Sequence, residues 1–277
     1  MAVPRIYADG HVHLYPAFDR VRWARAACAR AQTLAGPLLL LLCESQGHDY
    51  FALLDRQARA GGAPLDGAPT APWLAATEEP ESLSLSPDPS APPSTFVVAG
   101  RQVVTSEGLE VLALARRLEP PEDRAHSAPE LVRALLERGA IVVLPWGVGK
   151  WLGERGRRVD ALVNDPELRA HPLFFVGDIS HRTWPCPSPR PFQRGLRILA
   201  GTDVLPLRGL EASVASHGFV VQGALDPLRP AAALRETLRS GARTEPFGRK
   251  ASPVRMLVEQ LRLRLAGSEP GSSPQAP

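Results

Sequence analysis

Short, uninterrupted apolar runs recur along this chain, and a polar cluster follows each of them. The runs are Arg5–Ala8, Leu38–Cys43, Phe96–Ala99, Ala140–Trp146, Leu173–Val176 and Leu196–Ala200. They lack alternating polar positions, which is typical of strands that are buried on both faces in a parallel sheet. A buried helix segment also gives a run such as LLLLLC, but Pro37 before it and Glu44 after it favour a short strand. Each run is therefore predicted to be a strand.

Helical patterns separate these runs. Phe18–Leu34 carries an apolar stripe at helical spacing and stops at Gly36-Pro37. Further helices are expected at Asp49–Ala60, Pro129–Glu137, Pro230–Ser240 and from Ser252-Pro253 to about Leu265. Strands that alternate with helices predict an α/β architecture with parallel strands. One domain is expected over residues 1–266, and the polar tail 267–277 is expected to be disordered.

A proline-rich stretch at residues 61–94 interrupts this alternation, because it contains eight prolines. Within it, Glu81–Ser86 alternates strictly between polar and apolar residues, as an edge strand does. We therefore interpret Trp73–Ser86 as a hairpin inserted into a single domain. The less favoured alternative is a linker between two domains.

The composition excludes several classes of protein. A net charge of +3, without a basic stripe and interleaved aromatic residues, does not indicate a nucleic-acid partner. Three widely spaced cysteines support neither a disulfide framework nor a zinc knuckle. The first 13 residues lack a signal-peptide pattern, and no apolar run approaches the 18 residues of a membrane span. These features predict a cytoplasmic protein with no membrane partner.

The motif Asp9-Gly-His11-Val-His13 follows the first predicted strand directly. Residues i and i+2 of a strand point to the same face, so both imidazoles are able to reach one metal ion. The alternative is a pair of surface histidines in a turn. We favour metal ligation, because an HxH pair after an aspartate at the end of a first strand is a fairly specific combination.

Acidic residues follow three other predicted strands: Glu44, Asp178 and Asp203. Catalytic groups of parallel α/β barrels collect where the strands end, so these carboxylates are expected to converge with the histidine pair. Carboxylate and imidazole ligands together suit zinc, manganese or iron. The alternative is that each acid caps the helix that follows it.

Two further side chains are candidates for catalysis. Lys150 stands in Trp146-Gly-Val-Gly-Lys150-Trp151, and its charge suits a phosphate or carboxylate group. Only Lys150 and Lys250 are lysines among 32 basic residues, which draws attention to this position. His181 follows Asp178 by three residues and is a candidate ligand or general acid or base. The alternative for Lys150 is a solvated loop lysine.

The order of these motifs resembles that of two related superfamilies of metal-dependent hydrolases. The Asp9-x-His11-x-His13 start and the AGTDVLPLRG segment around Asp203 resemble motifs of the polymerase and histidinol phosphatase family and of the amidohydrolases. The middle of the chain, including GAIVVLPWG, is more similar to the first of these families. The resemblance covers roughly residues 5–220. It implies a single distorted (β/α) TIM-like barrel, with the Pro-rich hairpin as an insertion.

The chain also departs from the polymerase and histidinol phosphatase pattern. Gln102 stands in place of a bridging glutamate, Leu144-Pro145 in place of His-Pro, and Glu44 in place of Asp-His. We therefore expect one or two ions rather than three. The expected metal ligands are His11, His13, Asp203 and some of Glu44, Asp178 and His181.

The predicted function is therefore that of a metal-dependent hydrolase, and a phosphate ester is the favoured substrate. Asp178 or His181 would serve as the acid or base, and Lys150 would anchor a small anionic substrate. An amide or lactone hydrolase of the amidohydrolase type is one alternative. The other is a degenerate barrel that binds a ligand or a partner without catalysis.

Overall fold

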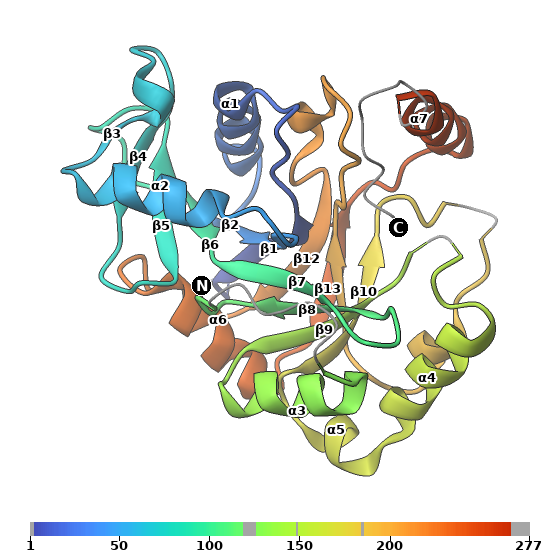
Figure 1. Cartoon of the computed structure of the whole chain (residues 1–277). Coiled ribbons are helices and arrows are strands. Elements are labelled where there is room, and N and C mark those ends of the chain that lie inside the picture. Colours follow the sequence, from blue (N-terminus) through green and yellow to red (C-terminus); the bar gives the residue numbers. More distant parts are fainter. Residues whose placement is uncertain (1–2, 119–125, 148, 184–185, 267–277) are drawn as a thin grey trace.

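The computed structural model describes residues 3–118, 126–147, 149–183 and 186–266 (Figure 1). Its strands form two mixed sheets, one of eight strands and one of five. No helix within these ranges combines the length and the apolar character that a bilayer span requires. The expected disordered tail, residues 267–277, lies outside the described part of the chain.

In the larger sheet, β1 and β2 are neighbours in the interior. Its order is β13 (Thr244–Gly248), β12 (His217–Gln222), β1 (Arg5–Val12), β2 (Leu38–Leu42), β6 (Thr95–Val98), β5 (Ser82–Ser86), β4 (Trp73–Ala76) and β3 (Ala63–Pro64). β2 pairs in parallel with β1 and β6, and the other neighbours are antiparallel. The predicted hairpin is confirmed, since Trp73 pairs with Ser86. This hairpin extends the sheet through β6.

The smaller sheet contains the remaining five strands. Its order is β11 (Ile198–Gly201), β10 (Phe174–Ile179), β9 (Ile141–Pro145), β8 (Glu110–Leu114) and β7 (Gly100–Val104). β9, β10 and β11 run parallel, whereas β7 and β8 are antiparallel. The carboxyl ends of β9, β10 and β11 and the amino end of β8 therefore lie at the same edge.

The prediction of a closed, distorted (β/α) TIM-like barrel is wrong, because the strands form two mixed sheets rather than one closed parallel barrel. Apolar runs do not encode strand direction, and turns decide it instead. Between β7 and β8, Gly108 adopts a φ of 74° and closes a tight turn in which Thr105 N–H donates to Leu109 O. A helical crossover is therefore absent at this point.

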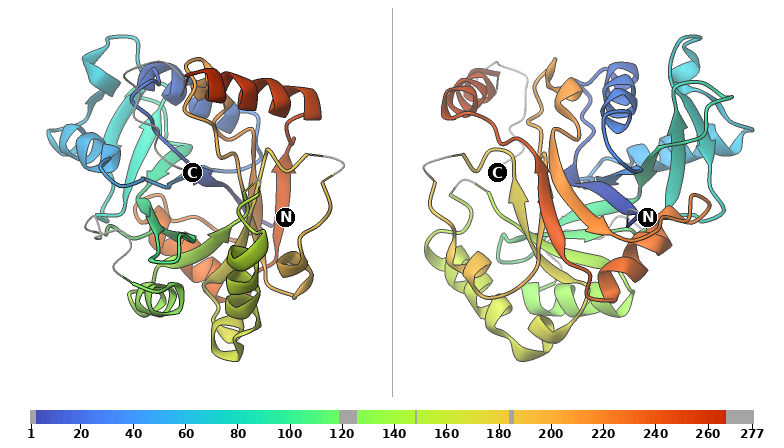
Figure 2. Two further views of the ribbon diagram at one scale, coloured as in Figure 1. Left: turned by 45° about the vertical axis from the view of Figure 1, so that its right-hand side comes forward. Right: turned by 180° about the vertical axis from the view of Figure 1, so that it is seen from behind.

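Seven α-helices and three short 3₁₀ helices lie within the described ranges. The α-helices are α1 (Arg20–Ala31), α2 (Tyr50–Arg59), α3 (Ala128–Glu137), α4 (Gly153–Asn164), α5 (Pro166–Ala170), α6 (Pro230–Arg239) and α7 (Pro253–Ala266). The 3₁₀ helices are Leu65–Gly67, Arg190–Gln193 and Leu210–Ser213. α4 and α5 were not predicted from the sequence. α1 and α7 lie at one end of the molecule, and α3 and α5 lie at the other (Figures 1 and 2).

The core consists of two clusters of buried side chains that share β2. Leu39 and Leu41 belong to one cluster, and Leu38, Leu40 and Leu42 belong to the other. Successive side chains of a strand point to opposite faces, so a run of five leucines fills both clusters. This arrangement confirms the prediction that LLLLLC is a strand buried on both faces.

The two sheets approach each other closely where β1 and β11 end. A Cβ at Gly201 would overlap the main-chain nitrogen of His11, and a Cβ at Gly10 would lie 2.8 Å from Ala200 O. Only glycine permits this approach. The two strand ends are thereby brought together, and each one leads into a segment that carries candidate ligands.

Candidate metal centre

His11 and His13 point from the end of β1 toward a common point. The two residues are 4% and 6% exposed, and their Nε2 atoms are 3.0 Å apart. A register irregularity between Asp9 and Val12 in the β1–β2 pairing accompanies this placement. Both imidazoles therefore face the same space, as the i, i+2 spacing predicted.

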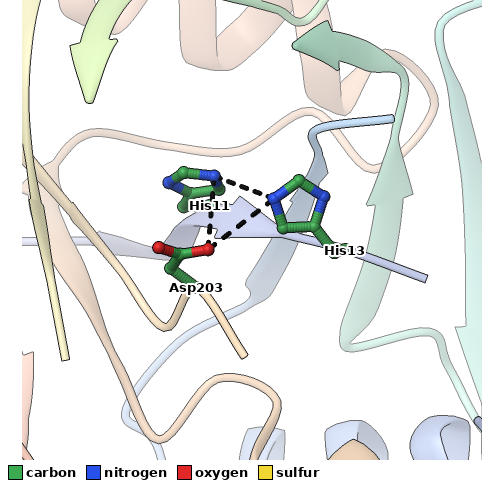
Figure 3. A group of neighbouring side chains, drawn as sticks. All are labelled: His11, His13 and Asp203. Atoms are coloured by element: carbon green, nitrogen blue, oxygen red, sulfur yellow. Dashed lines mark hydrogen bonds and ion pairs between the residues drawn. The ribbon is translucent and has the colours of Figure 1, made fainter. Parts of the chain in front are cut away.

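Asp203 reaches the same point from the segment after β11. Its Oδ1 lies 3.6 Å from His11 Nε2 and 3.7 Å from His13 Nε2 (Figure 3). The ligand atoms of the three residues all lie within 4.8 Å of one another, so the expected convergence of these residues is confirmed. Three atoms at these separations lie on a circle with a radius of about 2 Å, which is the bond length from zinc to nitrogen or oxygen ligands. The three residues therefore form a group able to hold a metal ion.

Asp9, the first residue of the histidine motif, fixes the backbone beneath this group. Its buried carboxylate accepts hydrogen bonds from Thr202 N and Oγ1, Ala215 N and His11 N. Burial raises the pKa of Asp9 to about 6, although these donors oppose the shift. Asp9 thus connects the segment that carries His11 to the segment that carries Asp203.

The electrostatics of the three side chains suit a cation. Burial, together with the charges of His11 and Lys150, lowers the pKa of His13 to about 3, so its ring is neutral at pH 7. Burial raises the pKa of Asp203, but the His11, His13 and Lys150 charges outweigh this effect and lower it below its usual value. A neutral imidazole and an ionised carboxylate are the forms that bind metals.

Lys150 lies beside the centre, but its ammonium is already paired. Its Nζ donates to both oxygens of Glu110, at 2.6 and 2.7 Å. Glu110 is the first residue of β8. The pair lies close enough to the centre that the charge of Lys150 influences the pKa values of His13 and Asp203.

The sequence interpretation missed Tyr15, which stacks on the ring of His13 with 5.2 Å between centroids. Burial and the nearby charges of Asp203 and Glu110 raise the pKa of Tyr15 well above its usual value, so the phenol stays neutral. The signal was present, because Tyr15 continues the i, i+2 series of His11 and His13.

His181 is held by a residue from a distant part of the chain. Its Nε2 lies 2.7 Å from Oε2 of Glu259 on α7, and both side chains are buried. His181 also lies near enough to Asp203 for its charge to lower the pKa of that carboxyl. No local sequence signal pointed to Glu259, because 78 residues separate the pair.

The carboxylates of the other two predicted acids, Glu44 and Asp178, bind groups outside the candidate metal centre. Glu44 accepts a hydrogen bond of 2.8 Å from Phe51 N, and burial raises its pKa to about 7. Asp178 binds Arg182 through both oxygens and Lys250 through Oδ2, and these cations lower its pKa against the effect of burial. Neither acid belongs to the group of converging ligand atoms among the described residues.

Comparisons with known proteins extend to the fold alone. No family model matches the sequence, and no curated protein matches it. Among solved structures, PsfC from Pseudomonas syringae PB-5123 is similar with a TM-score of 0.57, over 95% of this chain and 99% of that chain. The two sequences are 13% identical, so this likeness concerns the arrangement of the chain and not its chemistry. The family resemblance stays a prediction.

Proposed function

We propose that this protein is a metal-dependent hydrolase of phosphate esters, with one divalent ion held by His11, His13 and Asp203. The observation that carries the proposal is the triangle of donor atoms with sides of 3.0, 3.6 and 3.7 Å. Three protein ligands leave a position for water or substrate, which is typical of catalytic zinc sites, whereas structural sites use four ligands.

An ion held by these three residues would supply polarisation of a phosphoryl oxygen and activation of a water molecule. Lys150 places its ammonium beside the reacting group. Because Glu110 binds this ammonium at 2.6 and 2.7 Å, Lys150 Nζ is held in a fixed position and needs little reorganisation when an anion arrives. Tyr15, stacked on His13, holds that ring in place.

His181 is the candidate for proton transfer. Its Nε2 is engaged by Glu259 at 2.7 Å, which orients the ring and leaves Nδ1 to exchange a proton with the leaving group. In this role Glu259 is a positioning residue. Asp178, with both oxygens bound to cations, anchors Arg182 and Lys250 and is not assigned a proton-transfer step.

The test is metal content measured together with turnover. The full-length protein is stripped with a chelator and dialysed against zinc, manganese or iron(II), and bound metal is measured by mass spectrometry. The expected result is one ion per chain and metal-dependent hydrolysis of p-nitrophenyl phosphate. His13→Ala and Asp203→Asn should lose the metal, whereas the exposed control His126→Ala should keep it. A parent protein that takes up none of the three metals would refute the proposal.

A second candidate function is binding without turnover. It is favoured by the placement of Glu44, which bonds to Phe51 N and leaves only three converging ligands among the described residues. Stoichiometric metal without hydrolysis of a panel of phosphomonoesters, amides and lactones would select this second function.

A further inference from the structure

A basic pocket lies against the segment that carries Asp203, beside the candidate metal centre. Its volume is about 480 Å³, and Thr202 and Val204 line it, whereas the Asp203 carboxylate faces the two histidines. We call it the α7 pocket, since α7 and the residues that precede it form one wall. Its size is typical of a small-molecule site.

The lining of the α7 pocket is strongly cationic. Four basic side chains line it: Arg30, Arg249, Lys250 and Arg255. The acidic residue among its lining residues is Glu259. This excess of positive charge favours an anion.

The ion pairs show which basic side chains of the pocket lack an acidic partner. Lys250 lies 2.7 Å from Asp178, a carboxylate that it shares with Arg182, and Arg255 is paired with Glu259 at 2.6 Å. Among the residues that the structure describes, no carboxylate pairs with Arg30 or Arg249, and no unprinted contact satisfies them. Two guanidinium groups are thus left without a counter-charge.

Arg30 provides a second and independent observation. Its Nε is fully buried and has no hydrogen-bond partner. A buried donor without an acceptor costs about 1–3 kcal/mol, so the fold holds Arg30 here with no acceptor at Nε, and its guanidinium group stays available to the pocket that it lines.

Hydroxyl groups complete the lining. Ser213, Ser216 and Ser252 face the pocket, and Ser213 Oγ accepts from Arg255 Nη2 at 2.8 Å. Ser252 Oγ accepts from Arg255 N at 3.2 Å, at the first turn of α7. Guanidinium and hydroxyl donors around a helix start are the groups that bind phosphoryl oxygens.

We propose that the α7 pocket binds a phosphoryl dianion, at a site separate from the candidate metal centre. Two uncompensated guanidinium groups match the two charges of a phosphate monoester. The volume exceeds that of phosphate alone, which leaves room for a small attached group. Glu259 joins the pocket to the centre, since it bonds to Arg255 with Oε1 and to His181 with Oε2. A dianion in the pocket therefore acts on the same carboxylate that orients His181.

The experiment measures binding of inorganic phosphate and of phenyl phosphate by isothermal titration calorimetry. It uses the chelator-treated full-length protein, so that the metal centre contributes no ion. Arg30→Gln and Arg249→Gln, each alone, should weaken phosphate binding at least tenfold. Arg133→Gln is the matched control, because Arg133 on α3 pairs with Asp165, the N-cap residue of α5, and lies outside the pocket. Circular dichroism confirms that each variant is folded.

The role of the metal centre is separated by His13→Ala, which should bind phosphate as tightly as the parent protein. Tighter binding of phenyl phosphate assigns the pocket to an ester, and equal binding assigns it to free phosphate. Both results support the site. Loss of phosphate binding in His13→Ala, or unchanged binding in both arginine variants, would overturn the proposal, whether or not the metal-dependent hydrolysis is found.

Discussion

The main-chain N–H of Asp203 donates a hydrogen bond of 2.9 Å to the carbonyl oxygen of His11. This bond joins the end of β11 to the end of β1, and the two strands belong to different sheets. Asp203 has a φ of 48°, a left-handed conformation that costs a non-glycine residue about 1–2 kcal/mol. Backbone strain of this kind gathers at functional sites, where the surroundings impose it. The two candidate ligands are therefore positioned by their main chains.

Asp9→Asn should destabilise the protein and weaken the metal centre. An amide in place of the carboxylate turns an NH₂ group toward donors such as Thr202 N and Ala215 N. A loss of about 2–3 kcal/mol is expected, since a buried network is left partly unsatisfied. Denaturant unfolding of the metal-free protein measures it, with the exposed Glu137→Gln as control. Equal stability of the two variants would contradict this role of Asp9.

Gly201→Ala should separate the strand ends that carry the candidate ligands. The added Cβ would overlap the main chain of His11, and overpacking of this kind costs about 1–3 kcal/mol. Gly47→Ala is the comparison, because Gly47 has a positive φ but no atom within 4 Å of its added Cβ. Gly201→Ala should cost more than Gly47→Ala in thermal unfolding and should also lower metal affinity. A larger loss of thermal stability in Gly47→Ala than in Gly201→Ala would show that the two sheets move apart at this contact with little cost.

Glu44 should make the stability depend on pH. Burial raises its pKa in the folded protein to about 7 from 4.5, so the folded state binds more protons than the unfolded state between these values. Stability contributed by protonated Glu44 is therefore lost as the pH rises through this window. Glu44→Gln keeps an acceptor for Phe51 N and removes the titration. Its free energy of unfolding, relative to the parent protein, should rise by up to about 3 kcal/mol between pH 4.5 and pH 8. A constant difference across this range would exclude Glu44 as the source.

Lys150 should act through its charge alone. Lys150→Arg should keep part of the p-nitrophenyl phosphate turnover, and Lys150→Met should lose most of it, while both variants keep the metal. If Lys150 instead bridged metals as a carbamate, both variants would lose metal as well as activity. The salt bridge to Glu110 favours the charge role. Parent-like turnover in both variants would make Lys150 an ordinary loop residue.

Local signals in the sequence predicted much of the secondary structure. α3 begins with the capping box of Ser127 and Glu130 and ends before Gly139, as a Pro-led helix with a glycine stop should. The Trp73–Ser86 hairpin was marked by strict alternation. The arrangement of the strands was not predictable in this way, because the same apolar pattern suits parallel and antiparallel neighbours. The tight turn at Gly108 made β8 antiparallel.

The candidate site was predicted only where the spacing itself fixed the geometry. His11 and His13 share a strand face, and Asp203 follows a strand that ends at the same edge. Glu259 comes from α7, and no pattern near His181 points to a helix 78 residues away. Glu44 and Asp178 also follow strands, but a backbone N–H in one case and two cations in the other engage their carboxylates.

The five leucines of β2 serve both hydrophobic clusters at once, with alternate side chains in each. Each cluster loses buried leucines when this strand is removed. Neither cluster is therefore expected to stay folded without the other. Partial unfolding that detached β2 would expose apolar surface on both of its faces, and the free-energy cost would come from both clusters. The molecule should consequently unfold as one cooperative unit, and the strand that leads toward Glu44 should be among the last to exchange its amide hydrogens.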